Sequence, residues 1–328
     1  MKRRNLLGFI VAALVAPSKL FAQQPGRTYR LAVLLLRKNP AALAHMDALR
    51  ERLKQLGFVE GRNLQIVQEY AASDLAVTRE NAQKLVRAQP DAILSFGSTA
   101  TRIAHAAAGD IPVIFTIVGD AVAYGLVKEL ARPGANLTGV SSLQREMTVK
   151  RLELLRELLP KAKRIVFAGY LQDVTFLAAE TQYRDIAARL GLDLVTADGS
   201  GGLLVPVVSA AIRAGADALF VYQPISFIEQ QGAFEEIVRL ATERRIPVLV
   251  AESELVALGG LLSYGPVFLD ETRRAAELAA RVLKGAKVGG LPVEQSSRFE
   301  VVVNLKVANA LGIAVPRSIL VRADRVIE

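Results

Sequence analysis

The alternation of short apolar runs with longer amphipathic stretches is the feature that most constrains this fold. Residues 30–36 (RLAVLLL) are almost uniformly apolar, whereas residues 41–56 carry apolar side chains near helical spacing and end at Gly57. Short runs without a polar face are typical of strands that are buried on both sides of a parallel sheet. The alternation therefore predicts repeated βαβ units and an α/β fold.

The alternation occurs twice, which predicts two lobes of similar build, each with a mostly parallel sheet flanked by helices. Residues 131–140 (ARPGANLTGV) separate the two runs, and residues 259–266 (GGLLSYGP) end the second. Because Pro, Gly and Asn favour turns and linkers, we interpret both segments as crossovers between lobes. The predicted division is 28–140 for the first part of lobe 1, 141–262 for lobe 2, 263–304 for a return to lobe 1, and 305–328 for a C-terminal segment without a lobe assignment.

The crossovers also supply a predicted hinge. Glycines there can absorb backbone rotation when the lobes move. The expected hinge residues are Gly139, Ser141, Tyr264 and Gly265.

The first 22 residues have the pattern of a signal peptide. A basic start (MKRR) precedes an apolar run over residues 6–16, Pro17 interrupts it, and Ala22 offers a small residue at the expected cleavage point. Eleven apolar residues are fewer than the roughly 20 that a membrane span requires. We expect export to the periplasm, by the general or the twin-arginine route, and no stable membrane insertion after cleavage.

Composition excludes several kinds of site and partner. The chain has no cysteine, so thiolate catalysis, thiolate metal sites and disulfides are excluded. Its formal net charge is +9, but the basic residues alternate with acidic ones, aromatic residues make up 6% and tryptophan is absent. A nucleic-acid site would gather basic residues around stacking aromatic rings. We therefore expect no nucleic-acid partner.

The sequence also lacks the motifs of familiar enzymes. It contains no Gly-x-Ser-x-Gly, no Gly-x4-Gly-Lys-Ser/Thr and no His-Glu-x2-His pattern. The two histidines, His45 and His105, lie in predicted helices without an adjacent nucleophile. We predict a non-enzymatic protein without a cofactor or a metal site.

Polar loops at the predicted carboxyl ends of the strands are the candidate ligand site, because open α/β sheets bind ligands there. In Gly97-Ser98-Thr99 the glycine allows close backbone approach, and the two hydroxyls either bind an anionic ligand group at the helix N-terminus or cap that helix. The remaining candidates are Asn39, Gly119, Asp120, Tyr170, Tyr222 and Glu254. Capping is the alternative role of Asp120 and Glu254, and packing at a lobe rim is the alternative for the two tyrosines.

A set of motifs spread along the chain resembles one known family. The motifs are LGFVEGRN (56–63), VGDAV (118–122), LARPG (130–134), NLTG (136–139), KRLELL (150–155), SYGP (263–266), LPVEQ (291–295), NLK (304–306) and ALGI (310–313). Together they resemble the ABC-type solute-binding proteins of the family that includes tryptophan-binding proteins, whose fold is that of the leucine/isoleucine/valine-binding proteins.

The resemblance implies a periplasmic binding protein of the type I fold. Such a protein captures a small molecule between its lobes and delivers it to the permease and ATPase subunits of an importer, and we expect it to be a monomer. Ala121, Ser253 and Val267 depart from residues that are common in the family, which leaves the ligand undefined. A sensor domain for a signalling partner and an exported hydrolase remain the alternative functions.

Overall fold

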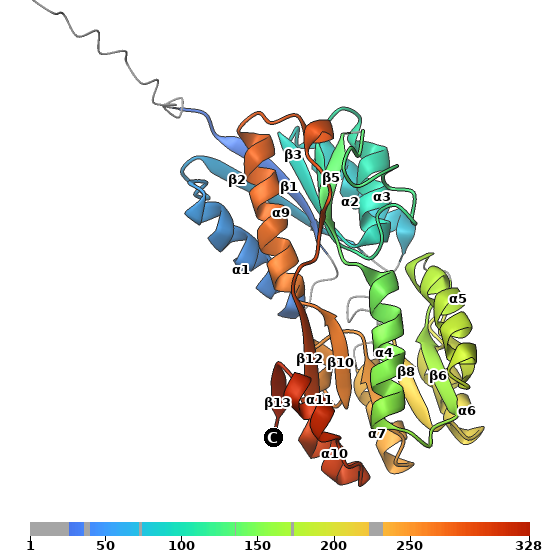
Figure 1. Ribbon diagram of the computed structural model, residues 1–328. Helices are drawn as coiled ribbons and strands as arrows, with labels where there is room; N and C mark the ends of the chain where they lie inside the picture. The colour runs from blue at the N-terminus through green and yellow to red at the C-terminus, as the bar shows by residue number, and fades with distance from the viewer. Residues whose placement is uncertain (1–25, 36–39, 72–73, 135, 172–173, 223–231) are drawn as a thin grey trace, which may run out of the picture.

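The computed structural model describes residues 26–35, 40–71, 74–134, 136–171, 174–222 and 232–328. The predicted signal peptide and Asn39 lie outside these ranges. The described chain forms two lobes that lie one above the other (Figure 1). This confirms the predicted α/β architecture of two mostly parallel sheets flanked by helices.

The first lobe is built on a six-stranded parallel sheet with the order β11-β5-β4-β3-β1-β2. Helices α1 and α9 cover one face, and α2 and α3 cover the other (Figure 1). The strands are β1 (Tyr29–Leu35), β2 (Leu64–Tyr70), β3 (Ala92–Phe96), β4 (Val113–Val118), β5 (Leu137–Ser141) and β11 (Glu294–Gln295). The helices are α1 (Pro40–Gln55), α2 (Leu75–Arg87), α3 (Ser98–Ala108), α9 (Phe268–Leu283) and the 3-10 turn η2 (Val288–Gly290).

The second lobe is built on a seven-stranded sheet with the order β13-β12-β10-β9-β8-β6-β7, in which the β10–β12 pair alone is antiparallel among the described strands. The strands are β6 (Arg164–Gly169), β7 (Asp193–Asp198), β8 (Ala218–Val221), β9 (Val248–Val250), β10 (Leu262–Pro266), β12 (Phe299–Asn304) and β13 (Arg325–Ile327). The helices are α4 (Gln144–Leu158), α5 (Val174–Arg189), α6 (Leu204–Arg213), α7 (Ala233–Glu243), α8 (Glu254–Ala257), α10 (Leu305–Leu311) and α11 (Arg317–Arg322).

The chain crosses between the lobes three times. The crossings run from β5 to α4, from β10 to α9 and from β11 to β12. The prediction that residues 263–304 return to lobe 1 is therefore wrong for two strands, because β10 and β12 pair with each other in the second sheet. Only α9, η2 and β11 return to the first lobe, and residues 305–328 add α10, α11 and β13 to the second.

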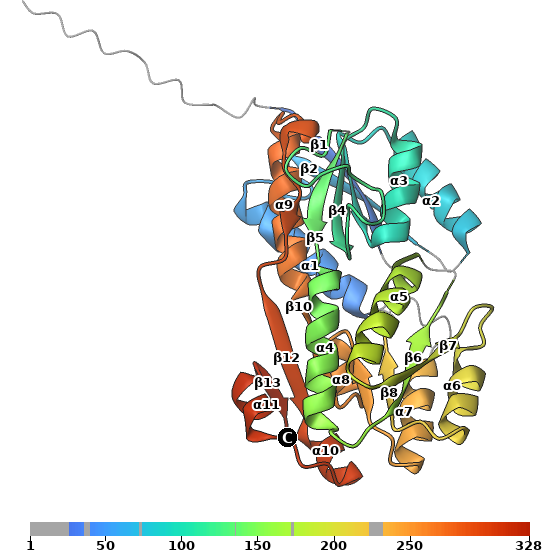
Figure 2. The same cartoon turned by 45° about the vertical axis from the view of Figure 1, so that its right-hand side comes forward.

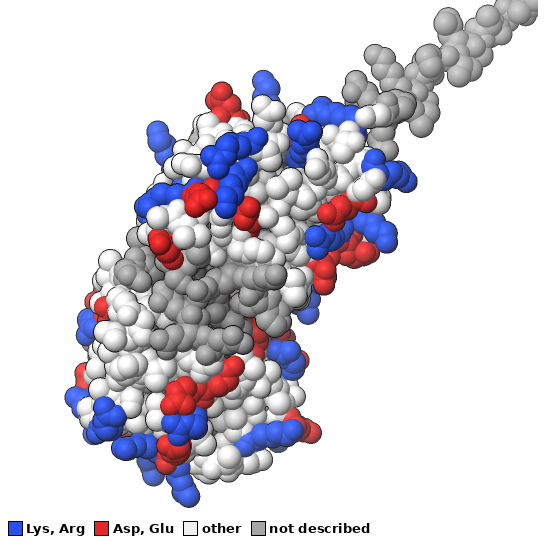
Figure 3. Space-filling model, turned by 180° about the vertical axis from the view of Figure 1, so that it is seen from behind, with Lys and Arg blue, Asp and Glu red and all other residues white. Residues whose placement is uncertain are grey.

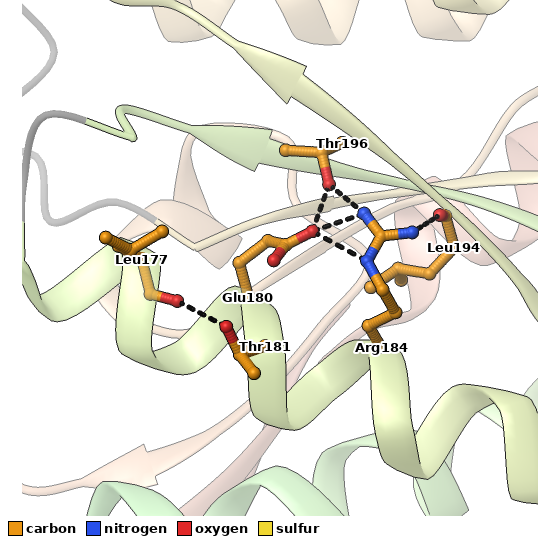
Figure 4. A network of polar contacts seen from close by, with 6 residues as sticks. All are labelled: Leu177, Glu180, Thr181, Arg184, Leu194 and Thr196. Carbon is orange, nitrogen blue, oxygen red and sulfur yellow. Dashed lines mark hydrogen bonds and ion pairs between the residues drawn. The ribbon is translucent and has the colours of Figure 1, made fainter.

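A polar network fixes α5 on the edge of the second sheet (Figure 4). The Arg184 guanidinium donates to the Glu180 carboxylate, to the Thr196 hydroxyl of β7 (2.7 Å) and to the Leu194 carbonyl (3.1 Å). The Thr196 hydroxyl in turn donates to Glu180 (2.6 Å). The network thus ties α5 to β7 at the edge of the second sheet.

Charges of both signs are interspersed on the face of the molecule that Figure 3 presents. Along the helices several exposed charges are paired, as in Arg239 with Glu236 and Lys150 with Glu153. Exposed pairs of this kind stabilise a fold by at most about 1 kcal/mol each. The basic residues on this face thus belong to a mixed, solvated surface.

Candidate functional site

The turn between β3 and α3 is the most constrained loop of the first lobe. Gly97 has φ +86°, a conformation that L side chains rarely adopt, and its N–H donates to the Thr116 carbonyl (2.9 Å). Gly97 itself occupies the N-cap position, so no side chain caps α3, and Ser98 and Thr99 are its first two residues. Neither hydroxyl therefore occupies the N-cap position that the capping alternative requires. Both lie at the positive end of an 11-residue helix.

Asp120 follows β4 and caps the next turn. Its Oδ1 atom accepts hydrogen bonds from the backbone N–H groups of Val122 (3.1 Å) and Ala123 (2.9 Å). The capping role predicted as one alternative is therefore present in the structure. It leaves the second carboxylate oxygen available, and Asp120 also lines both cavities described next.

Two cavities adjoin Asp120, and the smaller of them lies between the lobes. One, of about 300 Å³, is bounded by the loop after β4 in the first lobe and by α4, α5 and the end of β8 in the second. Its lining residues are Asp120, Ala123, Tyr124, Thr148, Ala178, Ala179, Thr181, Gln182, Asp185 and Tyr222. The other, of about 340 Å³, adjoins the first crossing and is lined by Gly119, Asp120, Val122, Ala123, Leu130, Ser141, Leu143 and Gln295. Figure 2 shows α4 and α5 side by side below the first lobe.

The two predicted tyrosines lie on opposite faces of the second sheet. Tyr222 is 4% exposed, packs against Phe167 with ring centroids 5.4 Å apart, and reaches the smaller cavity. Tyr170 is equally buried but belongs to the apolar cluster under α6 and α7. Only Tyr222 of the pair therefore faces either cavity.

A buried arginine that the sequence analysis missed supports Tyr222. Arg151 of α4 is 2% exposed, and its guanidinium carbon lies 6.0 Å from the centre of the Tyr222 ring. Its Nε donates to the Tyr264 carbonyl (2.7 Å) and its Nη1 donates to the Tyr183 hydroxyl (3.3 Å). Burial raises the pKa of Tyr183, so that hydroxyl stays neutral. Arg151 thus connects the cavity wall to strand β10 at the second crossing.

Glu254 lies apart from this group. It is exposed, begins the four-residue helix α8 and receives a hydrogen bond from the neighbouring Ser253 hydroxyl (3.4 Å). Neither of the two cavities above includes it.

The four predicted hinge residues occupy strands or strand ends. Gly139 lies within β5, where a Cβ atom would stand 2.3 Å from the Phe115 carbonyl oxygen, and at Gly265 in β10 the same atom would stand 2.4 Å from the Ala251 oxygen. Both glycines therefore allow close packing of strands. Ser141, at the end of β5, accepts the Ser296 N–H at its carbonyl (2.9 Å).

Two titratable groups are buried where α1 packs on α9. Glu271 belongs to α9, and His45 of α1 contacts its neighbour Thr272. Nothing in the sequence marked either of them as buried. Glu271 is 2% exposed, and burial raises its pKa to about 7. His45 of α1 is 5% exposed, its Nδ1 lies 2.8 Å from the Thr272 hydroxyl, and burial lowers its pKa to about 4. Both side chains are thus mostly uncharged within the fold between about pH 4 and pH 7.

The described residues form neither a metal site nor a membrane-spanning helix. Within them, no cluster of three or more His, Cys, Asp or Glu side chains has the geometry to hold a metal ion. In the same part of the chain, no helix combines the length and the apolar character needed to cross a membrane.

Comparison with known proteins identifies relatives across nearly the whole chain. Residues 30–327 match the family model described as ABC transporter substrate binding protein. A tyrosine-binding protein of Clostridioides difficile (strain R20291) is 29% identical over 260 residues, which cover 79% of this chain and 74% of that protein.

Two solved structures extend the likeness to three dimensions. The structure of an ABC domain in complex with L-Trp from Streptococcus pneumonia has a TM-score of 0.82 and 25% identity, covering 92% of this chain and 100% of that one. A ligand-free, open structure of a substrate binding protein with adhesive properties from Clostridium difficile has a TM-score of 0.67 and 27% identity, covering 92% and 99%. The chain therefore belongs to the ABC transporter substrate binding protein family and has the periplasmic-binding-protein type I fold.

Proposed function

We propose that this protein captures an amino acid, with an aromatic side chain preferred, in the space between its lobes and delivers it to an ABC importer. The observation that carries the proposal is that Asp120 of the first lobe and Tyr222 of the second line one cavity. A ligand that contacts both would stabilise the closed arrangement of the lobes.

Polar groups at the strand ends of the first lobe suit the two charges of an amino acid. The N-terminus of α3, with Ser98 and Thr99, favours a carboxylate, and the free oxygen of Asp120 favours an ammonium group. Tyr222 offers a ring for an apolar or aromatic side chain. The tyrosine-binding relative and the relative with bound L-Trp support this choice of ligand.

The rest of the proposal concerns place and partners. The N-terminal signal pattern supports export to the periplasm, and family membership supports a permease and an ATPase as partners of a monomeric receptor. We propose that the ligand is released unchanged, because the sequence offers no recognisable nucleophile–base pair. Mass spectrometry after long incubation with the protein should return the amino acid unaltered, and accumulation of a converted product would contradict this.

A thermal-shift screen of the 20 amino acids, followed by small-angle scattering, tests the binding proposal. L-Tyrosine or L-tryptophan should raise the melting temperature by mass action, and the hit should reduce the radius of gyration of the ligand-free protein. Denaturing and refolding the protein beforehand removes any amino acid carried through purification. If neither aromatic amino acid shifts the melting temperature of the refolded protein, the ligand class is wrong. If a tight hit leaves the scattering of an open protein unchanged, the closure is wrong.

A further inference from the structure

A buried carboxyl group lies where the three interlobe crossings meet. Glu271 is in the first turn of α9, directly after the second crossing. Its Oε2 accepts a hydrogen bond from the Ser142 hydroxyl in the first crossing (3.0 Å) and from the Ile117 N–H at the end of β4 (3.1 Å). Its Oε1 is hydrogen-bonded to the Ser296 hydroxyl in the third crossing. One side chain thus joins all three crossings.

The backbones of the crossings also lie against one another. The Val267 N–H of the second crossing donates to the Arg298 carbonyl of the third (3.1 Å), and the Ser296 N–H of the third donates to the Ser141 carbonyl at the start of the first (2.9 Å). The lobes can change their mutual angle only by moving these segments. Such a movement shifts the partners of Glu271 relative to each other, and so breaks or bends its hydrogen bonds.

We propose that Glu271 is the positioning residue of the hinge, and that its hydrogen bonds to the crossings set the balance between the described arrangement of the lobes and a more open one. The proposal deepens the proposed function, since ligand capture would use the same hinge. It concerns the protein without ligand, however, and is tested there.

The surroundings of Glu271 contain few other groups that can change its charge. Strands β3, β4 and β5, which pack against α9, bring no ionisable side chain. The nearest group of α1 is His45, whose pKa of about 4 keeps it neutral at neutral pH. The other charges that link α9 to its neighbours are in ion pairs, namely Arg274–Glu294, Asp270–Arg298 and Arg52–Glu277. Glu271 is thus the group here that titrates near pH 7.

The charge of Glu271 therefore gives the hinge a dependence on pH with a defined sign. The buried carboxyl group releases its proton at about pH 7, whereas a carboxyl group in water does so at 4.5. Raising the pH from 6 to 8 favours an arrangement that exposes Glu271 to water by up to about tenfold. Glutamine keeps the shape and, by accepting at its oxygen and donating to Ser296 from its amide, imitates the protonated form.

Distance measurements between two spin labels on the ligand-free protein test the proposal. The chain has no cysteine, so Arg102→Cys on α3 and Arg189→Cys on α5, both exposed, give one label on each lobe. In the otherwise unchanged protein, the distance distribution should be narrow at pH 6 and should broaden toward longer distances at pH 8. With Glu271→Gln it should be narrow at both values, and with Glu271→Ala it should be broad at both. Glu277→Gln, at a half-buried position on the same helix that bonds to Arg52 and not to the crossings, should behave as the unchanged protein does.

Two results would overturn the proposal. One is a Glu271→Ala protein, folded by circular dichroism, whose distances match the unchanged protein at pH 6. The other is a Glu271→Gln protein that still broadens with pH, a result that remains decisive even if the alanine variant fails to fold. Failure to bind any amino acid would contradict the proposed function, while the label distances would be unaffected by it.

Discussion

The two lobes share an architecture but build their cores from different side chains. In the second lobe, Phe167 lies at the centre of a stack of rings whose centroids are 4.6 to 5.7 Å away, formed by Phe176, Tyr183, Phe220 and Tyr222. The first lobe is mainly aliphatic around β1 and β3, with Phe96 packed against His45. Aromatic packing in the second lobe therefore continues from the core to the cavity wall at Tyr222. In the first lobe the cavity wall consists of the loop that follows β4, with Asp120, Ala123 and Tyr124.

From this difference we expect the two lobes to contribute differently to ligand binding. The second lobe would supply a rigid ring surface, and the first would supply hydrogen-bonding groups on backbone turns. Truncation of one fully buried phenylalanine in each lobe tests most directly whether the two cores differ. Phe167→Ala and Phe115→Ala should each lower the free energy of unfolding by about 3–5 kcal/mol. The loss should be about 1 kcal/mol larger for Phe167 because of its ring contacts. Urea unfolding measures both, and an equal or larger loss at Phe115 would contradict the distinction between the cores.

The contribution of the first lobe's hydrogen-bonding groups to ligand binding can be tested at the N-terminus of α3. Ser98→Ala should weaken binding of the aromatic amino acid found in the screen by roughly 1.5–3 kcal/mol, because a hydrogen bond to a charged group is lost. Titration calorimetry measures the change, and Ser209→Ala on the exposed side of α6 is the control. Affinity that is unchanged in Ser98→Ala would mean that the first lobe holds the ligand elsewhere.

The first lobe's two buried titratable groups make opposite contributions to stability as the pH changes. The neutral Glu271 stabilises the fold fully below pH 4.5, and this contribution is lost as the pH rises through 7. The neutral His45 stabilises the fold above pH 6.5, and this contribution is lost as the pH falls through 4. Between pH 4.5 and 6.5 the two dependences cancel, because the folded and unfolded states bind the same number of protons at the pair.

Replacing one member of the pair should reveal the pH dependence of stability that the other member causes. Relative to the unchanged protein, Glu271→Gln should lose about 2 kcal/mol more unfolding free energy when the pH falls from 6.5 to 4.5, since the His45 dependence is no longer offset. Urea unfolding at a series of pH values gives this difference, with Glu277→Gln as the control. Parallel curves for Glu271→Gln and the unchanged protein would show that the two groups do not balance.

The smallest effect is expected at the surface of the second lobe. Arg184 is about half exposed, so Arg184→Ala should change the free energy of unfolding by less than about 1 kcal/mol, even though it removes the hydrogen bonds that Arg184 makes in Figure 4. Thr196 still donates to Glu180 in that variant. A loss above 2 kcal/mol would mean that the rigidity of the second lobe depends on this edge as well as on its ring stack.

Much of the fold could be predicted from the sequence, because buried strands and amphipathic helices leave periodic patterns. Strand β5 and strand β10 were misread as crossovers, since both contain glycine and polar residues typical of linkers. Gly139 and Gly265 are glycines for a reason that only the neighbouring strands reveal, namely the approach of a carbonyl oxygen. The lobe to which β12 belongs was likewise fixed by pairing with β10, which no local pattern specifies.

The residues of the candidate site also fall into those that local sequence patterns reveal and those that only the fold reveals. The Gly97 turn and Asp120 could be identified because strand ends and turn residues are visible in the sequence. Arg151 and Glu271 could not, since each lies in an amphipathic helix where charged residues are ordinarily solvated. Their burial follows from where three distant segments of the chain meet.

The three crossings also have a consequence for how the chain reaches its native state. The first lobe lacks α9 until residue 283 is available, and the second lacks β12 and β13 until the last few residues. Neither core can close on a nascent chain, so most contacts that complete the lobes join residues far apart in sequence, and folding is correspondingly slow. A chain delayed in this way would still be unfolded after synthesis, the state in which the general export route takes up its cargo. The interleaved lobes would thus keep the precursor competent for the export that we propose.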